Sequence, residues 1–547
     1  MILKLVDIFA YLSVILRAAT LIGQSLLLGG VLFLFWIARP KAELGETSLE
    51  RVRFLSLRTF RIAALALVVV QALYLYVNSA VLMATAEIGL REVMGANFFI
   101  AGSIMLGASL LAAITAGIRS THSVWWLSLL VLIVLGASVM TNHAAARVEG
   151  RLPLILVTAL HEASTGFWIG GLPFLLLGVY VSRDRATQWY LTQRFSRLAL
   201  ISVAALVFSG LWMSLSYVGS VDSLVGTSYG VMILAKVMML AAMLALGGIN
   251  FLMLRRNQPE ETLPRLRRLV EAEVGIGITI VLAAASLTSQ PPAVDIVNDA
   301  VPPSHIVARF RPEWPRMRSP EATELSTLLP GQSPTNLDAK ARTVADVIEG
   351  VPISLRVMAD REWSEYNHHW MGLIVIAMGA LALLARTGRA KWAEYWPLLM
   401  IGIAIFIFLR GDPECWPLGP RSFWATWAKP EVFQHRLAAI LCVAFAIFEL
   451  RVRRNPTQGG VLPLIFPLLC ALGAALLLTH SHGTTNVKEE TLAELSHMPM
   501  AVLGVMAGWS RWLELRLPLE KDRGIAAWIW PVCFVLIGAV LLNYREI

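Results

Sequence analysis

Cysteine and charge are both scarce in this sequence of 547 residues. The four cysteines stand singly without a C-x-x-C pair, so the sequence indicates neither a disulfide framework nor a thiolate zinc site. Only 15% of the residues are charged, which excludes an ordinary soluble domain of this length. A G-x-x-x-x-G-K-S/T loop and a phosphorylated-aspartate ATPase signature are also missing, which excludes ATP hydrolysis by this chain as a driving force.

Apolar residues make up 57% of the chain and gather in runs long enough to cross a bilayer. These runs lie at about 6–37, 62–84, 96–118, 124–141, 153–181, 197–217, 230–254 and 273–289, and then at about 370–386, 395–409, 435–450, 461–480, 498–515 and 526–543. The first run is too long for the apolar part of a signal peptide. We therefore predict an all-α polytopic membrane protein with about fourteen transmembrane helices, eight before a polar stretch and six after it.

Lysine and arginine mark every second gap between these runs. They are Lys41, Arg51, Arg53, Arg58; Arg119; Arg183, Arg185, Arg194; Arg255, Arg256, Arg265, Arg267, Arg268; Arg386, Arg389, Lys391; Arg451, Arg453, Arg454; and Arg516, Lys521, Arg523. Because basic loops stay in the cytoplasm, both termini and the polar stretch are predicted to lie outside. The formal charge of +9 follows from this topology and indicates no nucleic-acid partner. We expect a transmembrane core at 1–292, an outer loop or small domain at 293–366 and a C-terminal six-helix domain at 367–547.

Two segments of the first block resemble each other. Gln24–Phe35 reads QSLLLGGVLFLF and Gly166–Leu177 reads GFWIGGLPFLLL, and an arginine-rich entry to the next helix follows each. Because four helices separate the copies, a duplication would give a parallel repeat of four plus four helices, as in some transporters. The alternative is that Gly-Gly pairs simply allow close helix packing.

Four ionisable side chains fall inside predicted spans, where a charge costs ~2.5–3.5 kcal/mol on insertion scales. They are Arg17 in the first helix, His161 in the fifth, Lys236 in the seventh and Glu273 at the start of the eighth. Lys236 and Glu273 would form either a structural ion pair or part of a cation pathway, and the pathway requires the two to be paired. His143, at the outer end of the fourth helix, could share an outward-facing metal site with His161.

The last six helices carry a stronger concentration of histidine. His368 and His369 begin the ninth helix, His435 begins the eleventh, His480 and His482 end the twelfth, and His497 begins the thirteenth. The topology derived from lysine and arginine sends all six to the outer boundary, although histidine played no part in deriving it. His497 and Met500 share one helical face, and Met498 lies between them in the sequence. The alternative is that these histidines cap helices at the membrane interface.

Imidazole and thioether together suit copper, since thioether selects Cu(I) and imidazole accepts either oxidation state. Imidazoles alone also suit zinc, or the iron of a b-type haem when two of them face each other across a flat slot. The residues by themselves therefore leave a copper site and a haem site open.

The chain also resembles a known family. It is similar to the bacterial copper resistance protein D family in His143-Ala144-Ala145, His161, Phe167 to Leu172, Arg197 to Trp212, Tyr229-Gly230, Leu234-Ala235-Lys236, Glu273 and Pro291-Pro292. The similarity covers about residues 120–292 well, and the last six helices resemble a C-terminal extension of longer members. The resemblance implies a bacterial inner-membrane protein tied to copper handling, which passes copper across the membrane together with a periplasmic copper-binding partner.

We therefore expect a multi-pass protein of the bacterial inner membrane, not an enzyme, that binds copper and has the lipid bilayer and a periplasmic copper-binding protein as partners. The expected copper ligands are His368, His369, His435, His480, His482, His497, Met498 and Met500, with a second site at His143 and His161 and a path past Arg17, Lys236 and Glu273. Two alternatives use the same histidines: a b-type haem oxidoreductase, and an assembly factor that delivers copper without transporting it.

Overall fold

The computed structural model describes residues 9–39, 46–118, 123–256, 258–320, 353–413, 415–419, 421–427, 430–454, 460–478 and 487–545. Within these ranges the backbone is overwhelmingly helical, and the one β-type pairing is an isolated bridge between Cys415 and Arg421. The chain forms two compact units. Unit 1 takes in the residues up to Ala300 together with Arg516–Leu519. Unit 2 takes in Val301–Leu477, helix α21 (Val487–Arg516) up to Leu515, and the residues from Glu520 on.

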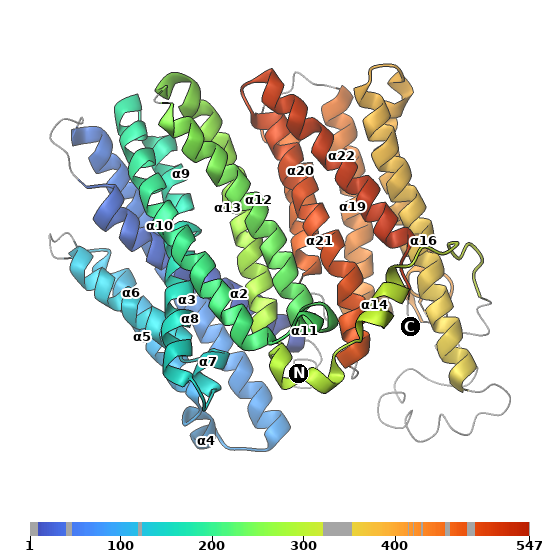
Figure 1. Cartoon of the computed structure of the whole chain (residues 1–547), viewed down its shortest axis with the longest axis horizontal. Coiled ribbons are helices and arrows are strands. Elements are labelled where there is room, and N and C mark those ends of the chain that lie inside the picture. The colour runs from blue at the N-terminus through green and yellow to red at the C-terminus, as the bar shows by residue number, and fades with distance from the viewer. Residues whose placement is uncertain are drawn as a thin grey trace. The chain divides into compact units, whose positions relative to one another are not determined.

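Unit 1 is a bundle of long helices that run side by side (Figure 1). These helices are α2 (Phe9–Leu32), α3 (Glu46–Ala86), α5 (Asn97–Thr115), α6 (Ser123–Val139), α8 (Arg151–Trp168), α9 (Leu172–Val181), α10 (Arg185–Val218), α12 (Ser228–Arg255) and α13 (Pro259–Thr288). Short helical turns lie between or after them: η1 (Phe33–Ile37), α4 (Leu90–Met94), α7 (His143–Ala146), α11 (Val221–Gly226), η2 (Ala293–Asp295) and η3 (Val297–Asp299).

The two Gly-Gly motifs of the sequence pack against each other inside unit 1. A methyl group on Gly29 of α2 would lie 2.2 Å from the backbone of Gly170, which stands between α8 and α9. A methyl group on Gly170 would lie 1.8 Å from the carbonyl oxygen of Ser25. Only glycine permits backbones to approach this closely. The structure therefore shows that the Gly-Gly pairs allow close helix packing. The alternative origin of the motif, a duplication of four helices, stays a prediction.

Unit 2 is a second helical bundle. Its helices are α14 (Pro303–Phe310), α16 (Ile353–Arg386), η8 (Lys391–Tyr395), α17 (Leu398–Arg410), α18 (Phe423–Thr426), α19 (Pro430–Arg454), α20 (Leu462–Leu477), α21, and α22 (Glu520–Leu542). Its core centres on Trp396 and Trp530, whose ring centroids lie 5.3 Å apart and which are each 1% exposed. Phe466 and Phe534 pack around this tryptophan pair.

The predicted outer segment is shared between the two units: its first residues, up to Ala300, belong to unit 1, and residues 301–320 belong to unit 2. Arg309 of α14 is buried and donates a hydrogen bond to the Ser496 hydroxyl at 3.2 Å. Further along, Arg410 donates to the Ser319 hydroxyl at 2.6 Å. These contacts hold residues 301–320, which we call the strap, against the end of α17 and the first half of α21. Helix α16 already begins at Ile353, so it extends well beyond the apolar run predicted at 370–386.

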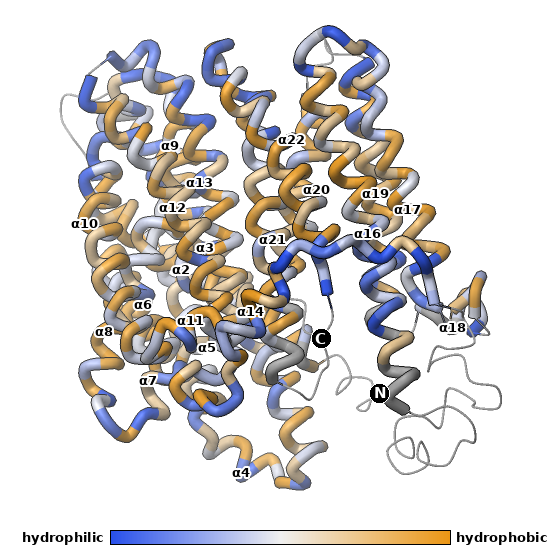
Figure 2. The backbone as a smooth tube through the Cα atoms, turned by 45° about the vertical axis from the view of Figure 1, so that its right-hand side comes forward, coloured by the Kyte–Doolittle hydropathy of each residue, from blue (hydrophilic) through white to orange (hydrophobic). Residues whose placement is uncertain are grey.

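The membrane class of the chain is confirmed. Among the described residues, 11 helices are long and apolar enough to cross a bilayer, and two shorter apolar helices occupy Val124–Val139 and Leu462–Leu477. Hydrophobic residues fill the middle of the helices and hydrophilic residues gather toward their ends (Figure 2). The protein is therefore an all-α polytopic membrane protein. The count of fourteen stays a prediction, because α21 covers the run at 498–515 but is not among these helices.

Candidate metal and transport sites

A buried polar cluster joins α2, α8 and the turn after α6 in unit 1. Arg17 donates to the Thr141 hydroxyl at 3.1 Å and to the Asn142 side-chain oxygen at 2.5 Å. Asn142 in turn donates to the Glu162 carboxylate, which also accepts a hydrogen bond from Gln24 at 3.2 Å. Arg17 and Glu162 are thus linked through one amide. This linkage lowers the cost of holding both charges inside a helical bundle.

His143 begins α7 next to this cluster. Its Nε2 atom is buried and has no hydrogen-bond partner among the described residues. Burial, and then the positive charge of Arg147, lower the pKa of His143, while Asp295, which pairs with Arg147 at 2.8 Å, opposes the shift. A neutral ring with a nitrogen lone pair is the form of histidine that binds metals.

His161 lies deeper in the bundle and does not share a site with His143. Its Nδ1 lies 3.2 Å from the Ser209 hydroxyl, whereas the His143 ring contacts Tyr217 with centroids 6.3 Å apart. Both partners belong to α10 and are eight residues apart, which corresponds to ~12 Å along a helix. One ion cannot bind both rings. Any metal sites at the two rings would be separate.

The expected ion pair between Lys236 and Glu273 is not formed. Glu273 accepts a hydrogen bond from Asn250 at 2.5 Å. Asn250 follows Lys236 by fourteen residues on α12, or ~21 Å along the helix axis, which is far beyond salt-bridge reach. Lys236 instead lies within electrostatic range of His161. The spacing on the sequence could not reveal this, because α12 and α13 are antiparallel neighbours and only their register decides which residues meet.

Two of the predicted copper ligands of unit 2 come together. The rings of His368 on α16 and His497 on α21 meet edge to face, with centroids 6.5 Å apart. Tyr544 stacks on His368 at 3.8 Å and lies 6.1 Å from His497. Nδ1 of His368 donates to the Ser364 carbonyl oxygen at 2.8 Å, so the lone pair of a neutral ring is on Nε2. We call these two residues the His368–His497 pair.

The other predicted ligands differ in their surroundings. His369 uses both ring nitrogens: Nδ1 accepts from the Arg316 backbone N–H at 2.7 Å, and Nε2 donates to the Tyr544 carbonyl oxygen at 2.8 Å. His369 is therefore a tether for the strap rather than a ligand in this conformation. His435 lies half-exposed with Nδ1 2.9 Å from the Asp412 carboxylate. His480 and His482 lie outside the described residues.

The methionines are both buried on α21. Met500 follows His497 by three residues and shares its side of the helix, whereas Met498 is two positions from Met500 and points elsewhere. Within the described ranges there is no group of three or more histidine, cysteine, aspartate or glutamate side chains arranged to hold a metal. The His368–His497 pair supplies two imidazoles and does not by itself form such a group. No pattern in the sequence pointed to Tyr544, which lies far from both histidines along the chain.

Residues 189–287 match the family described as Copper resistance protein D, and residues 370–484 match the LiaF transmembrane domain. The chain is 34% identical over 192 residues to Copper transport protein CutJ of Bacillus subtilis (strain 168), and the alignment covers 34% of this chain and 35% of that protein. The chain thus matches about a third of the length of this curated relative. No solved structure matches it. The first match runs from α10 to α13 and includes Ser209, Lys236 and Glu273.

Proposed function

We propose that this chain, which matches the copper resistance protein D family over residues 189–287, binds copper at its predicted outer face and moves the ion across the membrane through unit 1. The His368–His497 pair of unit 2 captures the ion in this proposal. The ion then passes through helices α10 to α13 and their neighbours in unit 1, where the family match lies. A periplasmic copper-binding protein is the proposed donor.

The observation that carries the proposal is the His368–His497 pair. Two imidazoles from separate helices contact each other edge to face, and rotation of one ring would point a nitrogen of each at a single ion with metal–nitrogen bonds of ~2 Å. Cu(I) accepts few ligands and tolerates thioether, so Met500 is a suitable third donor from the same face of α21. A pair of imidazoles therefore suits copper better than zinc, which takes four ligands in a structural site.

Passage through unit 1 has separate support. His143 presents an unpartnered ring nitrogen near one end of the bundle, and His161 follows ~12 Å further along α10. Histidines at successive depths give an ion places to stop on its way through a helical bundle. Lys236 does not fit a simple cation path, because its positive charge near His161 has no carboxylate partner at Glu273. The missing pair counts against the path past Lys236 that required it, so in this proposal Lys236 is a barrier that an ion at His161 has to overcome.

The test is copper uptake by proteoliposomes that enclose a copper-sensitive dye. Wild type and a His368→Ala/His497→Ala variant are compared with a matched control, His305→Ala, which removes an exposed histidine of α14 outside the pair. We expect uptake by wild type and the control and a large loss in the double variant. If wild type binds copper but does not take it up, the transport hypothesis is wrong, and the alternative of an assembly factor that delivers copper without transporting it is favoured.

The haem oxidoreductase is the alternative of a different class. A macrocycle needs a flat slot between two facing imidazoles, whereas Tyr544 stacks on His368 at 3.8 Å and approaches His497 to 6.1 Å. This packing favours a small ion at the pair. Purified protein with a Soret band would favour the haem enzyme instead.

A further inference from the structure

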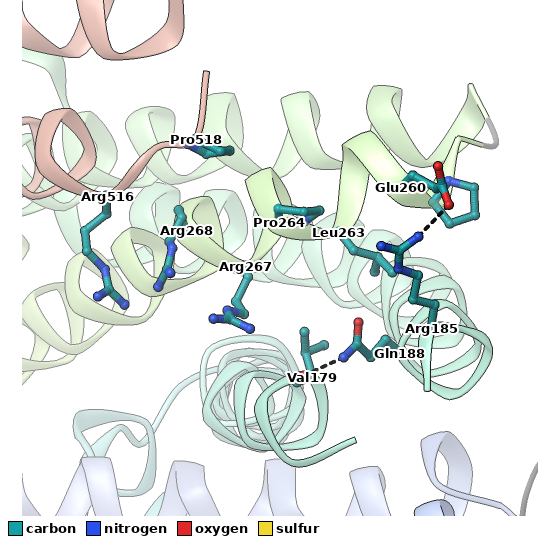
Figure 3. A pocket seen from close by; sticks show the side chains of 11 residues that line it. Val179, Arg185, Gln188, Glu260, Leu263, Pro264, Arg267, Arg268, Arg516 and Pro518 are labelled. Carbon is teal, nitrogen blue, oxygen red and sulfur yellow. Dashed lines mark hydrogen bonds and ion pairs between the residues drawn. The ribbon is translucent and has the colours of Figure 1, made fainter. Parts of the chain in front are cut away.

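Unit 1 has a second polar feature, at the end opposite to α7 (Figure 1). A cleft of about 200 Å³ opens there, where α9 ends and α10 and α13 begin. Its polar lining consists of Arg185, Gln188, Glu260, Arg267, Arg268 and Arg516, all of which belong to unit 1 (Figure 3). Four guanidinium groups around one small cleft are unusual, because like charges repel unless they are neutralised.

The carboxylates nearby neutralise part of this charge. Glu271 lies 2.6 Å from Arg268 and 2.8 Å from Arg516, so one carboxylate serves two guanidinium groups. Glu260 lies 2.5 Å from Arg185 at an exposed edge of the cleft. Four guanidinium groups against these two carboxylates leave an excess of two positive charges.

Arg267 is the one arginine of the four that forms no ion pair with Glu260 or Glu271. Its guanidinium carbon lies 4.0 Å from the centroid of the Tyr180 ring, and no carboxylate pairs with it among the described residues. In Figure 3 it stands between Arg268 and Arg185, with its guanidinium group within the cleft. This cation–π contact with Tyr180 holds the guanidinium group of Arg267 beside the ring without using its N–H donors in an ion pair.

We propose that this cleft binds the phosphate group of an anionic ligand. A planar guanidinium fork matches two phosphate oxygens, and a charge excess of two is enough to neutralise either the single charge of a phosphodiester or the nearly double charge of a free phosphate. Arg267 would supply the fork, with Arg268 and Arg516 beside it. The cleft lies at the end of the bundle that basic loops predict to be cytoplasmic, where both phospholipid headgroups and soluble phosphate compounds are present. The proposal does not depend on copper transport.

The test measures phosphate binding to the full-length protein, purified in detergent. Native mass spectrometry with phosphatidylglycerol or phosphatidylcholine tests a lipid source, and a titration with inorganic phosphate or pyrophosphate tests a soluble source. The variant is Arg267→Gln, which removes no ion pair and should fold. The matched control is Arg256→Gln, which removes an exposed arginine just after α12, outside the residues that line the cleft.

We expect binding of phosphatidylglycerol in preference to phosphatidylcholine, weakened about tenfold by Arg267→Gln and unchanged by Arg256→Gln. An Arg267→Lys variant should fall in between, because it keeps the charge and loses the fork. Binding of phosphate or pyrophosphate alone, with the same dependence on Arg267, would support the site and assign it to a soluble ligand. Absence of all binding, or equal weakening by both glutamine variants, would overturn the proposal.

Discussion

The imidazole rings of His368 and His497 meet edge to face with centroids 6.5 Å apart, across helices α16 and α21. Tyr544, just after α22, fills the remaining side by stacking on His368. Arg309 of α14 lies over the Tyr544 ring at 5.4 Å. The pair is therefore positioned by three helices and by the strap, so its geometry depends on the tertiary packing of unit 2.

Helix packing in unit 1 gives a first prediction. Gly170→Ala should destabilise the protein severely, because the new methyl group would lie 1.8 Å from the Ser25 carbonyl oxygen and the backbones would have to separate. Overpacking of this kind costs ~1–3 kcal/mol or more. Gly248→Ala on α12 is the control, since its methyl group would meet no atom within 4 Å. Thermal unfolding in detergent measures both. Equal stability of the two variants would refute the close contact.

The sequence predicted the class of the fold well, because repeated apolar runs of spanning length are typical of membrane proteins and rare elsewhere. It predicted helix ends poorly. The apolar run at 370–386 is only the C-terminal half of α16. The run at 153–181 is divided into α8 and α9 around Gly170-Gly171. Hydropathy identifies the residues that suit the bilayer interior. A helix can continue into polar residues beyond the bilayer, so the end of an apolar run does not mark the end of the helix.

The candidate site was predictable in part for a related reason. The positions of lysine and arginine predicted that the histidines share one membrane boundary. The partners of their ring nitrogens, in contrast, are decided by contacts that only folding creates. His369 differs from His368 by one position on α16 and binds the Arg316 backbone and Tyr544 instead of facing His497. One residue changes the direction of a helical side chain by ~100°.

A buried ion pair of unit 2 gives a second prediction. The Glu449 carboxylate is fully buried and lies 2.7 Å from Arg511, whose side chain is 6% exposed. Glu449→Ala should lower the free energy of unfolding by up to ~3 kcal/mol, because the buried Arg511 guanidinium then keeps only its second carboxylate, Glu514 at 2.7 Å. Arg185→Ala breaks an exposed pair with Glu260 and should cost no more than about 1 kcal/mol. Denaturation curves that ranked the two variants in the opposite order would contradict the importance of the buried pair.

A third prediction concerns the protonation of His143. Arg147→Gln should raise the pKa of His143, and Asp295→Asn should lower it further, because Arg147 opposes the charged ring and Asp295 favours it. Ring-carbon NMR titration of labelled histidine measures both shifts. Since the folded pKa is below the ordinary value of ~6.5, the unfolded chain binds the proton first, and stability from this group is lost as pH falls below ~6.5. Shifts in the same direction for both variants would exclude an electrostatic cause.

The barrier assigned to Lys236 gives a fourth prediction. Lys236→Met should increase the rate of copper uptake into proteoliposomes, because it removes a positive charge near His161. Lys236→Arg keeps the charge and should leave the rate close to that of wild type. Loss of uptake in Lys236→Met, with protein that remains folded, would mean that the lysine takes part in transport.

The central claim is that the His368–His497 pair holds copper, and the most direct test is elemental analysis together with an absorption spectrum. Protein is purified from copper-supplemented cells as wild type, as His368→Ala/His497→Ala, and as the control His305→Ala. We predict copper without a Soret band in wild type and the control, and loss of copper in the double variant. Unchanged copper in the double variant, or a Soret band in wild type, would contradict the claim.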